Sequence, residues 1–238
     1  MFRNSEIPAS EGFSGDLIWT RLTAERKRNK SSANGAGLFY FKGDALGNIL
    51  SAQQGYSHLL DIEYYFILGR KNKTVELTIE FTKTHFYHIA GLQHLKDLPR
   101  LTASTEMIYD QLQTGIVTQE YIESSQYYNN IQLRIDYLIF LEQIFDSNET
   151  IFKYNPKLQA FSVIEADFLL KNSINKTSVY AFLSKGQNGK YFCKSFFPDN
   201  KKDYTEGQTR WTVLYKKKIN KLSKTEIILY QHPSFYLS

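Results

Sequence analysis

The chain has 238 residues, of which 42% are hydrophobic, and a formal net charge of +5. This length and composition suffice for one sizeable core with no more than a small accessory unit beside it. The single cysteine, Cys193, excludes an internal disulfide, and neither a secretory leader nor an apolar run long enough to cross a bilayer is evident, so we expect a cytoplasmic protein with no membrane contact.

Residues 1–60 are predicted to form an N-terminal arm or accessory segment, because glycines interrupt every regular pattern before residue 38. In this segment we expect a short strand at Leu38–Phe41 and a helix at Ala45–Leu60. The basic stretch Arg21–Lys30 runs into Ser-, Asn- and Gly-rich sequence that is typical of a loop.

Residues 61–238 are predicted to form one helix-plus-sheet domain. Two strand-like runs, joined by a polar turn at Arg70–Lys73, precede a block of helices that ends in one long helix at Tyr127–Phe145. After Asn148 the hydrophobic pattern alternates with period two, as strands require. We therefore expect an α+β fold, in which a helical N-terminal half is followed by an antiparallel β-sheet. The six strands expected there are Ile151–Tyr154, Phe161–Leu170, Ser178–Lys185, Lys190–Phe197, Gln208–Lys217 and Thr225–Gln231.

Three of the five histidines lie in the segment Thr82–Leu95, directly after a predicted strand. On a helix, His85 and His88 would share the core-facing stripe, whereas His94 would point to solvent. A histidine on such a face is either a hydrogen-bonded core residue or a proton-transfer group, because its ordinary pKa is about 6.5. Metal binding is the weaker alternative, since zinc takes three or four ligands and no third ligand is evident; we expect no metal and no cofactor.

Arg134 is the only charged residue in the apolar stripe of the predicted helix Tyr127–Phe145. Burying an unpaired guanidinium is costly, so Arg134 either pairs with a carboxylate, such as Glu165 or Asp167, or faces an anion-binding cavity. Its planar set of donors suits a phosphate well.

The region from Lys185 to Lys224 has eleven Lys or Arg residues against three acidic ones, and aromatic residues lie between them. Basic strands with aromatic spacing are typical of a nucleic-acid groove, in which cations bind phosphates and rings stack on unpaired bases. The alternative is a sheet with one solvated face. Ser195 is either a phosphate-binding hydroxyl or a small packing residue, which is the commoner case. The candidate nucleic-acid-binding residues are Lys194, Tyr204, Arg210, Lys216, Lys217 and Lys218.

Four short motifs resemble one known group: HFYHIAGLQHLKD, QLRIDYL with Arg134, KSFFPDNKKDYT and TVLYKKK. They resemble the phage-associated branch of the Barnase-EndoU-colicin-RelE-like nuclease superfamily, over roughly Tyr64 to Lys218. The strongest elements are the His-x-x-Gly-Leu helix start at His88 and the Ser-Phe-Phe strand at Ser195. The resemblance implies a compact nuclease-like fold and metal-independent RNA cleavage, in toxins, phage or mobile-element effectors, or inactive relatives.

Such cleavage needs a base, an acid and cations that stabilise the charged phosphorane. His88 fits the base or acid, with His85 as its partner, Arg134 and Lys216 fit the charge-stabilising role, and Ser195 or Tyr204 fits a phosphate oxygen. The leading hypothesis is a ribonuclease with RNA as its partner and an inhibitor or antitoxin protein as a further candidate partner. The alternatives are a non-catalytic nucleic-acid- or protein-binding module of the same fold, and an enzyme acting on a nucleotide cofactor, such as an ADP-ribosyl transferase.

Overall fold

The computed structural model describes residues 47–147, 151–159, 162–199 and 201–236. One compact unit extends from Ala45 to Ser238. It includes the helix before residue 60, which the sequence analysis assigned to the N-terminal segment. The basic stretch Arg21–Lys30 and the predicted strand Leu38–Phe41 lie outside the described residues.

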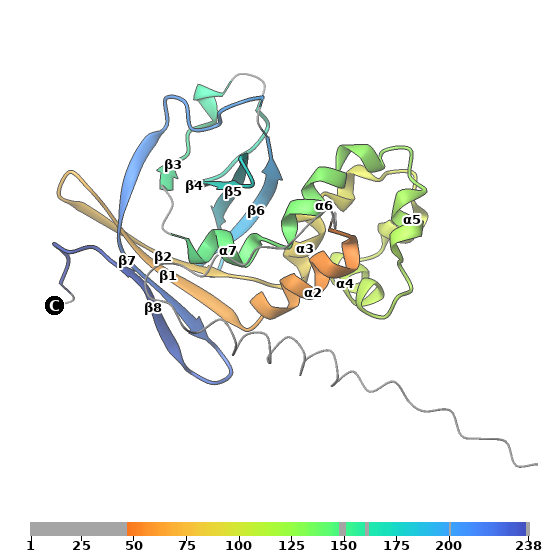
Figure 1. Ribbon diagram of the computed structural model, residues 1–238, viewed down its shortest axis with the longest axis horizontal. Helices are drawn as coiled ribbons and strands as arrows, with labels where there is room; N and C mark the ends of the chain where they lie inside the picture. Colours follow the sequence, from red (N-terminus) through yellow and green to blue (C-terminus); the bar gives the residue numbers. More distant parts are fainter. Residues whose placement is uncertain (1–46, 148–150, 160–161, 200, 237–238) are drawn as a thin grey trace, which may run out of the picture. The chain divides into compact units, whose positions relative to one another are not determined.

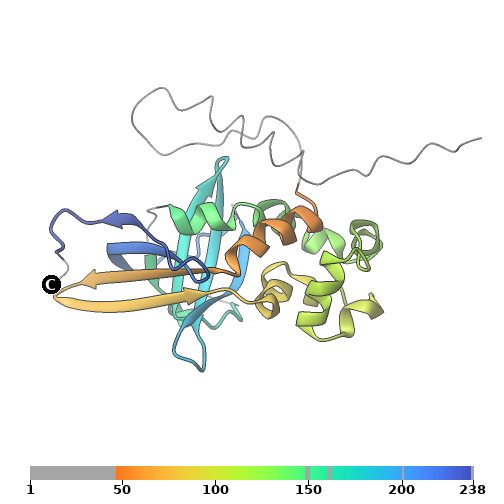
Figure 2. The ribbon, with the colours of Figure 1, turned by 90° about the horizontal axis from the view of Figure 1, so that it is seen from below.

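The compact unit is a mixed α+β structure, and Figures 1 and 2 show its strands at one end and most of its helices at the other. The longer helices are α2 (Ile49–Leu59), α3 (Lys83–Ile89), α4 (Thr105–Gln113), α5 (Gln119–Glu123), α6 (Gln132–Leu138) and α7 (Leu141–Asp146). Short 3₁₀ turns are η1 (Leu92–His94), η2 (Pro99–Thr102), η3 (Tyr128–Asn130) and η4 (Pro156–Leu158). The strands are β1 (Ile62–Arg70), β2 (Lys73–Glu80), β3 (Ile151–Lys153), β4 (Phe168–Ile174), β5 (Thr177–Lys185), β6 (Tyr191–Pro198), β7 (Thr209–Asn220) and β8 (Glu226–Gln231).

The sheet closes on itself, because β1 pairs with both β2 and β7. Seven strands form the closed ring in the order β1-β2-β6-β5-β4-β3-β7, and β8 adds to the outside of β7. All pairings are antiparallel except the short β2–β6 contact at Ile79 and Tyr191, which is parallel. The turn between β1 and β2 has positive φ at Lys71 and Asn72, as a tight hairpin requires.

The α+β class predicted from the sequence is confirmed, and the predicted order of its parts is only partly right. β1 and β2 come before the helical block and belong to the same sheet as the later strands. The first two strands therefore do not form a separate layer: β1 holds β7 and β2 touches β6, which closes the ring.

The predicted helix Tyr127–Phe145 is divided into η3, α6 and α7. At the division the amide of Phe140 donates to Tyr137 O at 3.1 Å, a bond to the residue three back that tightens the turn. The apolar period survives the division, because Ile135, Leu138 and Leu141 all stay buried. Because the apolar spacing continues on both sides of the division, the sequence does not show where the helix is divided.

A main core fills the space between the helices and the inner faces of the strands, and a smaller cluster lies on the opposite face of β4 and β5. Leu169, Tyr180 and Phe182 belong to this second cluster, and Phe197 and Tyr204 pack against it. β6 is in contact with both α3 and α6 (Figure 1), so residues from the helical block reach the strand that carries Phe197.

Candidate nucleic-acid site

The α3 helix ends earlier than the sequence predicts, and its end creates the centre of the candidate site. The helix expected within Thr82–Leu95 stops at Ile89, and Gly91 takes the left-handed conformation with φ +81°. A glycine is favoured there because it has no Cβ to clash in that conformation. A Cβ on Gly91 would lie only 2.9 Å from Ile131 Cγ2 and 3.1 Å from Arg134 Cδ. Gly91 thus lets the Arg134 side chain lie against the end of α3.

Arg134 extends from α6 across this end. Its guanidinium lies over the Phe197 ring, with 5.5 Å from Cζ to the ring centroid, and its Nη1 donates to His88 O at 3.4 Å. Burial lowers the pKa of Arg134 to about 10, so the group stays charged at neutral pH. Among the described residues no carboxylate forms an ion pair with Arg134, because Asp167 pairs with Lys153 and Glu165 lies beside Lys194. Of the two alternatives for Arg134, an ion pair with a carboxylate or a position facing an anion-binding cavity, the second fits this geometry.

Six buried side-chain polar atoms have no hydrogen-bond partner in the described structure, and three of them are Arg134 Nε, His85 Nδ1 and Gln93 Oε1. Buried polar groups are nearly always hydrogen-bonded, so each exception requires an explanation. The Gln93 amide nitrogen lies 3.4 Å from His88 O, the same carbonyl that accepts from Arg134. A ligand or ordered water at this place would satisfy atoms that the protein itself leaves unpaired.

His85 and His88 differ in their surroundings. The His85 ring stacks on Phe192 of β6, with 4.5 Å between centroids and 11° between planes. Burial lowers the pKa of His85, and the nearby Glu80 carboxylate opposes this effect. His88 is exposed and does not face the core as predicted, because the buried face of α3 is formed by Phe86 and Ile89. Partial desolvation still lowers the pKa of His88, so its ring is neutral at pH 7.

His94 is exposed, as predicted, and it also lies near enough to Arg134 to feel its charge. The turn at Gly91 ends α3, and η1 carries His94 to a place where burial, and then the charge of Arg134, lower its pKa. Its Nε2 lies 3.5 Å from the Gln93 amide nitrogen. The available signal was Gly91 itself, since a glycine after a run of helical residues often marks a helix end.

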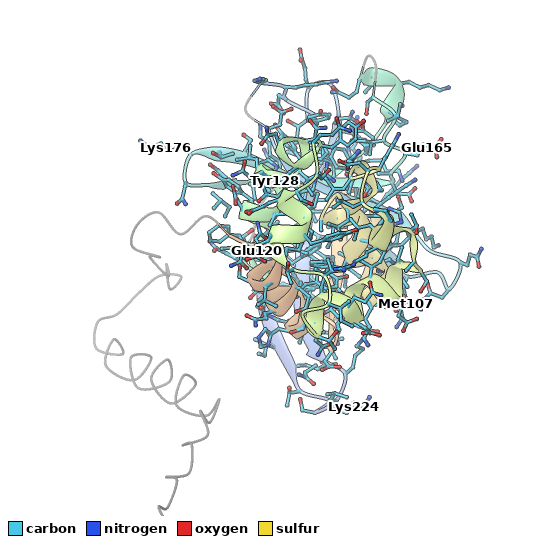
Figure 3. The ribbon with its side chains drawn as sticks, turned by 90° about the vertical axis from the view of Figure 1, so that its right-hand side faces the viewer. Met107, Glu120, Tyr128, Glu165, Lys176 and Lys224 are labelled. Carbon is cyan, nitrogen blue, oxygen red and sulfur yellow. The ribbon has the colours of Figure 1, made fainter. Side chains whose placement is uncertain are left out.

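A cavity of about 460 Å³ opens beside Arg134. Its walls come from three segments: η3 with the start of α6, residues 162–164, and the end of β6 with the loop after it. Tyr128 and Glu165, labelled in Figure 3, mark η3 and the residue that follows the second segment. The polar and aromatic residues of its lining include Asn129, Asn130, Arg134, Phe197, Lys202 and Tyr204. Arg134 and Tyr204, which the sequence analysis selected separately, thus line one cavity.

Ser195 lies on β6 between Phe192, whose ring stacks on His85, and Phe197, whose ring lies under the Arg134 guanidinium. The pairing of β5 with β6 matches Phe182 to Ser195 and Leu183 to Cys193, which leaves Lys194 as a bulged extra residue. Ser195 therefore takes the face of Phe182 and Phe197, away from the buried Cys193. The strict alternation predicted for this strand is wrong, because the bulge adds a residue and changes the face on which Ser195 lies.

Two of the three consecutive lysines of β7, Lys216 and Lys218, bind the α7 helix. Lys216 is fully buried, and its Nζ donates to the carbonyls of Phe145 and Asp146, at 2.9 and 3.1 Å, and to that of Ser147. Lys218 pairs with Glu142 and Asp146, and Lys217 pairs with Glu226 on β8. Lys194 lies 3.9 Å from Glu165, and Arg210 is exposed on β7. The structure does not bring Lys216 to Lys218 into the lining of the cavity.

Within the described ranges, no group of three or more His, Cys, Asp or Glu side chains is placed to hold a metal ion. None of the described helices has the length and apolar character that a membrane span needs.

The family model described as phage-Barnase-EndoU-ColicinE5/D-RelE like nuclease 4 matches residues 48–232, nearly the whole of the compact unit. Comparison with curated proteins and with solved structures gave no match.

Proposed function

The chain belongs to the phage-Barnase-EndoU-ColicinE5/D-RelE like nuclease 4 family, and from this premise we propose that it cleaves RNA without a metal ion, by attack of a 2′-hydroxyl on the adjacent phosphorus. The observation that carries the choice of site is the guanidinium of Arg134, which lines the cavity and whose buried Nε has no hydrogen-bond partner in the described structure. It lies beside the main-chain carbonyl of His88, and an anionic ligand in the cavity would complete its hydrogen bonding.

The proposed reaction assigns one step to each group. His88 accepts the proton of the 2′-hydroxyl, because its lowered pKa keeps the ring neutral at pH 7. The new O2′–P bond forms as the P–O5′ bond breaks, and the departing oxygen receives a proton from the protonated form of His85, which is the minor form at pH 7 because burial lowers its pKa. The products are a 2′,3′-cyclic phosphate and a free 5′-hydroxyl.

Arg134 stabilises the extra negative charge on the phosphorane. Its Nε is unpaired and its bond to His88 O is long at 3.4 Å, so a phosphate oxygen competes with little in the protein. The neighbouring Phe197 ring and the burial of the side chain reduce screening by water, which strengthens the interaction. Ser195 and Tyr204 are proposed to hold phosphate oxygens or the adjoining nucleotide, while Lys194 and Arg210 are proposed outer contacts to the RNA backbone.

Lys216 is left out of the proposed charge-stabilising role, because its ammonium already binds three main-chain carbonyls. Lys202 takes its place as the second cation, since it lines the cavity with Arg134. A toxin-like role, with an inhibitor or antitoxin protein that protects the producing cell, is part of the same proposal.

The test is incubation of the purified protein with total RNA and with transfer RNA in excess chelator, followed by analysis of the product ends. We expect cleavage with 2′,3′-cyclic phosphate ends, reduced about 10²-fold or more in His88→Ala and in Arg134→Ala. His232→Ala is the matched control, because His232 lies after β8 and bonds to Ser234. Cleavage that requires added magnesium, or that persists in His88→Ala, would overturn the mechanism.

One observation favours the alternative of a non-catalytic binding module. His85 stacks on Phe192, as a histidine with a purely structural role would. The same experiment separates the two functions. Intact RNA after incubation with every variant, together with a salt-sensitive mobility shift, would replace catalysis by binding.

A further inference from the structure

The cavity beside Arg134 has features that the cleavage reaction itself does not need. Phosphate chemistry needs the guanidinium and the histidines, whereas Asn129 and Asn130 lie on the η3 side of the cavity, before Arg134 in the chain. Both amides are exposed, and no side-chain hydrogen bond of either is found in the described part of the chain. An amide offers a donor and an acceptor together, which is the combination that reads the edge of a base.

The opposite side of the cavity is aromatic and apolar. Phe197 and Tyr204 meet with their centroids 5.2 Å apart, and Phe182 lies behind them both. Two apolar side chains of the cavity lining are open to solvent: Val163, with 94% of its surface exposed, and Leu133, on α6 next to Arg134, with 52%. A flat ring placed between these groups and the amides would cover apolar surface that now faces water.

Size and charge limit the ligand to about one nucleotide. A volume of about 460 Å³ is within the roughly 300–1,000 Å³ typical of small-molecule sites. Two cations, Arg134 and Lys202, face one carboxylate, Asp199, whose Oδ1 accepts from the backbone amides of Lys201 and Lys202. This balance suits one phosphate and an uncharged ring better than it suits a polyphosphate.

We propose that this cavity is a base-specific subsite for single-stranded RNA, in which an unpaired base enters beside Phe197 and Tyr204 and Asn129 and Asn130 bind its edge, while Arg134 holds the adjoining phosphate. The ligand class rests on the proposed function. A base inside a duplex does not reach such a cavity, so the subsite admits only a nucleotide that is turned out of its stack or was never paired. Asn129 and Asn130 are thereby specificity-determining residues and not catalytic ones.

The test measures binding and not cleavage, so that a failure of catalysis does not decide it. Labelled RNA pentamers that differ only in the central base are titrated, in chelator, against a His88→Ala background and against the same background carrying Asn129→Ala and Asn130→Ala. We expect one base to be bound about 5- to 100-fold more tightly than the others, the discrimination typical of a good bidentate amide contact. That ratio should fall below about twofold in the double-asparagine variant. Gln54→Ala, which removes an exposed amide on α2 outside the cavity, should leave the ratio unchanged.

The outcomes separate the two proposals. Base preference that disappears with the asparagines supports the subsite even if the parent protein cleaves nothing. Equal binding of all four bases, an undiminished preference in the double variant, or the same preference for a pre-formed duplex would overturn it. RNA cleavage with any of these results would leave the nuclease in place without the subsite.

Discussion

Gly91 provides a direct test of whether Arg134 must lie against the end of α3. Gly91 and Gly115 occupy the same local position after a helix, with φ values of +81° and +73°. The amide of each bonds three residues back, to His88 O and to Leu112 O, at 3.2 Å in both cases. The left-handed conformation costs an alanine about 1–2 kcal/mol at either site. The two glycines differ in what a Cβ would meet.

A Cβ on Gly115 meets nothing within 4 Å, whereas one on Gly91 lies 2.9 Å from Ile131 Cγ2 and 3.2 Å from Arg134 Nε. Because ordinary contacts begin at 3.4 Å, Ile131 and Arg134 must both move by a few tenths of an ångström or more. Misplacing a reacting group by about 1 Å can cost about 10²-fold in rate. We therefore expect Gly91→Ala to lower kcat/KM for RNA cleavage by about 10- to 100-fold, and Gly115→Ala by less than about threefold.

The assay pairs single-turnover cleavage of a transfer RNA in chelator with urea unfolding of each variant. Gly115→Ala should lose about 1–2 kcal/mol of unfolding free energy, and Gly91→Ala about 2–4 kcal/mol, because overpacking adds to the shared backbone strain. Activities are compared at temperatures where both variants are fully folded. Equal activity of the two alanine variants would refute the reasoning, since the contact with Arg134 is the difference between them.

Four further outcomes are expected. The acidic limb of kcat/KM should have its midpoint below pH 6.5, because desolvation lowers the pKa of His88 and a base must be neutral; a midpoint above 6.5 would exclude it as the base. Burial lowers the pKa of His85 in the folded protein, so as the pH falls below 6.5 the unfolded chain binds a proton at His85 before the folded protein does. The free energy of unfolding in urea should therefore be lower at pH 5.0 than at pH 7.5, and this loss should be smaller in His85→Gln. Lys216→Ala should lose about 2–4 kcal/mol in the same measurement, because three carbonyls lose their donor, whereas the exposed Lys185→Ala should change stability by less than about 0.5 kcal/mol. A plot of log binding constant against log salt for single-stranded RNA should have a slope of about −1.4 if the two cavity cations supply the phosphate contacts, and a slope beyond about −4 would require a wider basic surface.

Composition and periodicity predicted the class of fold, and they selected Arg134 and Tyr204, which line one cavity. They failed where a single residue changes the direction of the chain. The run after Asn148 alternates in apolar character, and five of the six strands expected there lie close to their predicted bounds, whereas the predicted strand Phe161–Leu170 corresponds to β4 at Phe168–Ile174. Closure of the sheet was beyond prediction, because the β1–β7 pairing joins residues about 150 positions apart and no local pattern encodes it. Arg134 was identified because a charge in an apolar stripe is costly, and that argument does not depend on how long the helix is.

The strict alternation expected on β6 fails at the Lys194 bulge, which changes the face on which Ser195 lies, and the helix expected after Thr82 ends at Gly91. At both points the backbone leaves the period that was extended through it. Gly91 was visible in the sequence as a helix end. The bulge was not, since Lys194 is an ordinary exposed strand residue until its neighbours are paired with Phe182 and Leu183.

Several basic residues of the C-terminal third form contacts within the protein, whereas the sequence indicated that they would bind nucleic acid. Lys190, Lys217 and Lys218 lie in ion pairs with acids from other elements, and Lys216 binds main-chain carbonyls at the end of α7. A paired lysine gains little by approaching a phosphate, because it must first give up an existing partner. Arg134 is placed differently, since it has no carboxylate partner in the described structure and its Nε is unpaired. In the proposed function a phosphate therefore meets Arg134 at the cavity, where the guanidinium also donates to the main-chain carbonyl of His88.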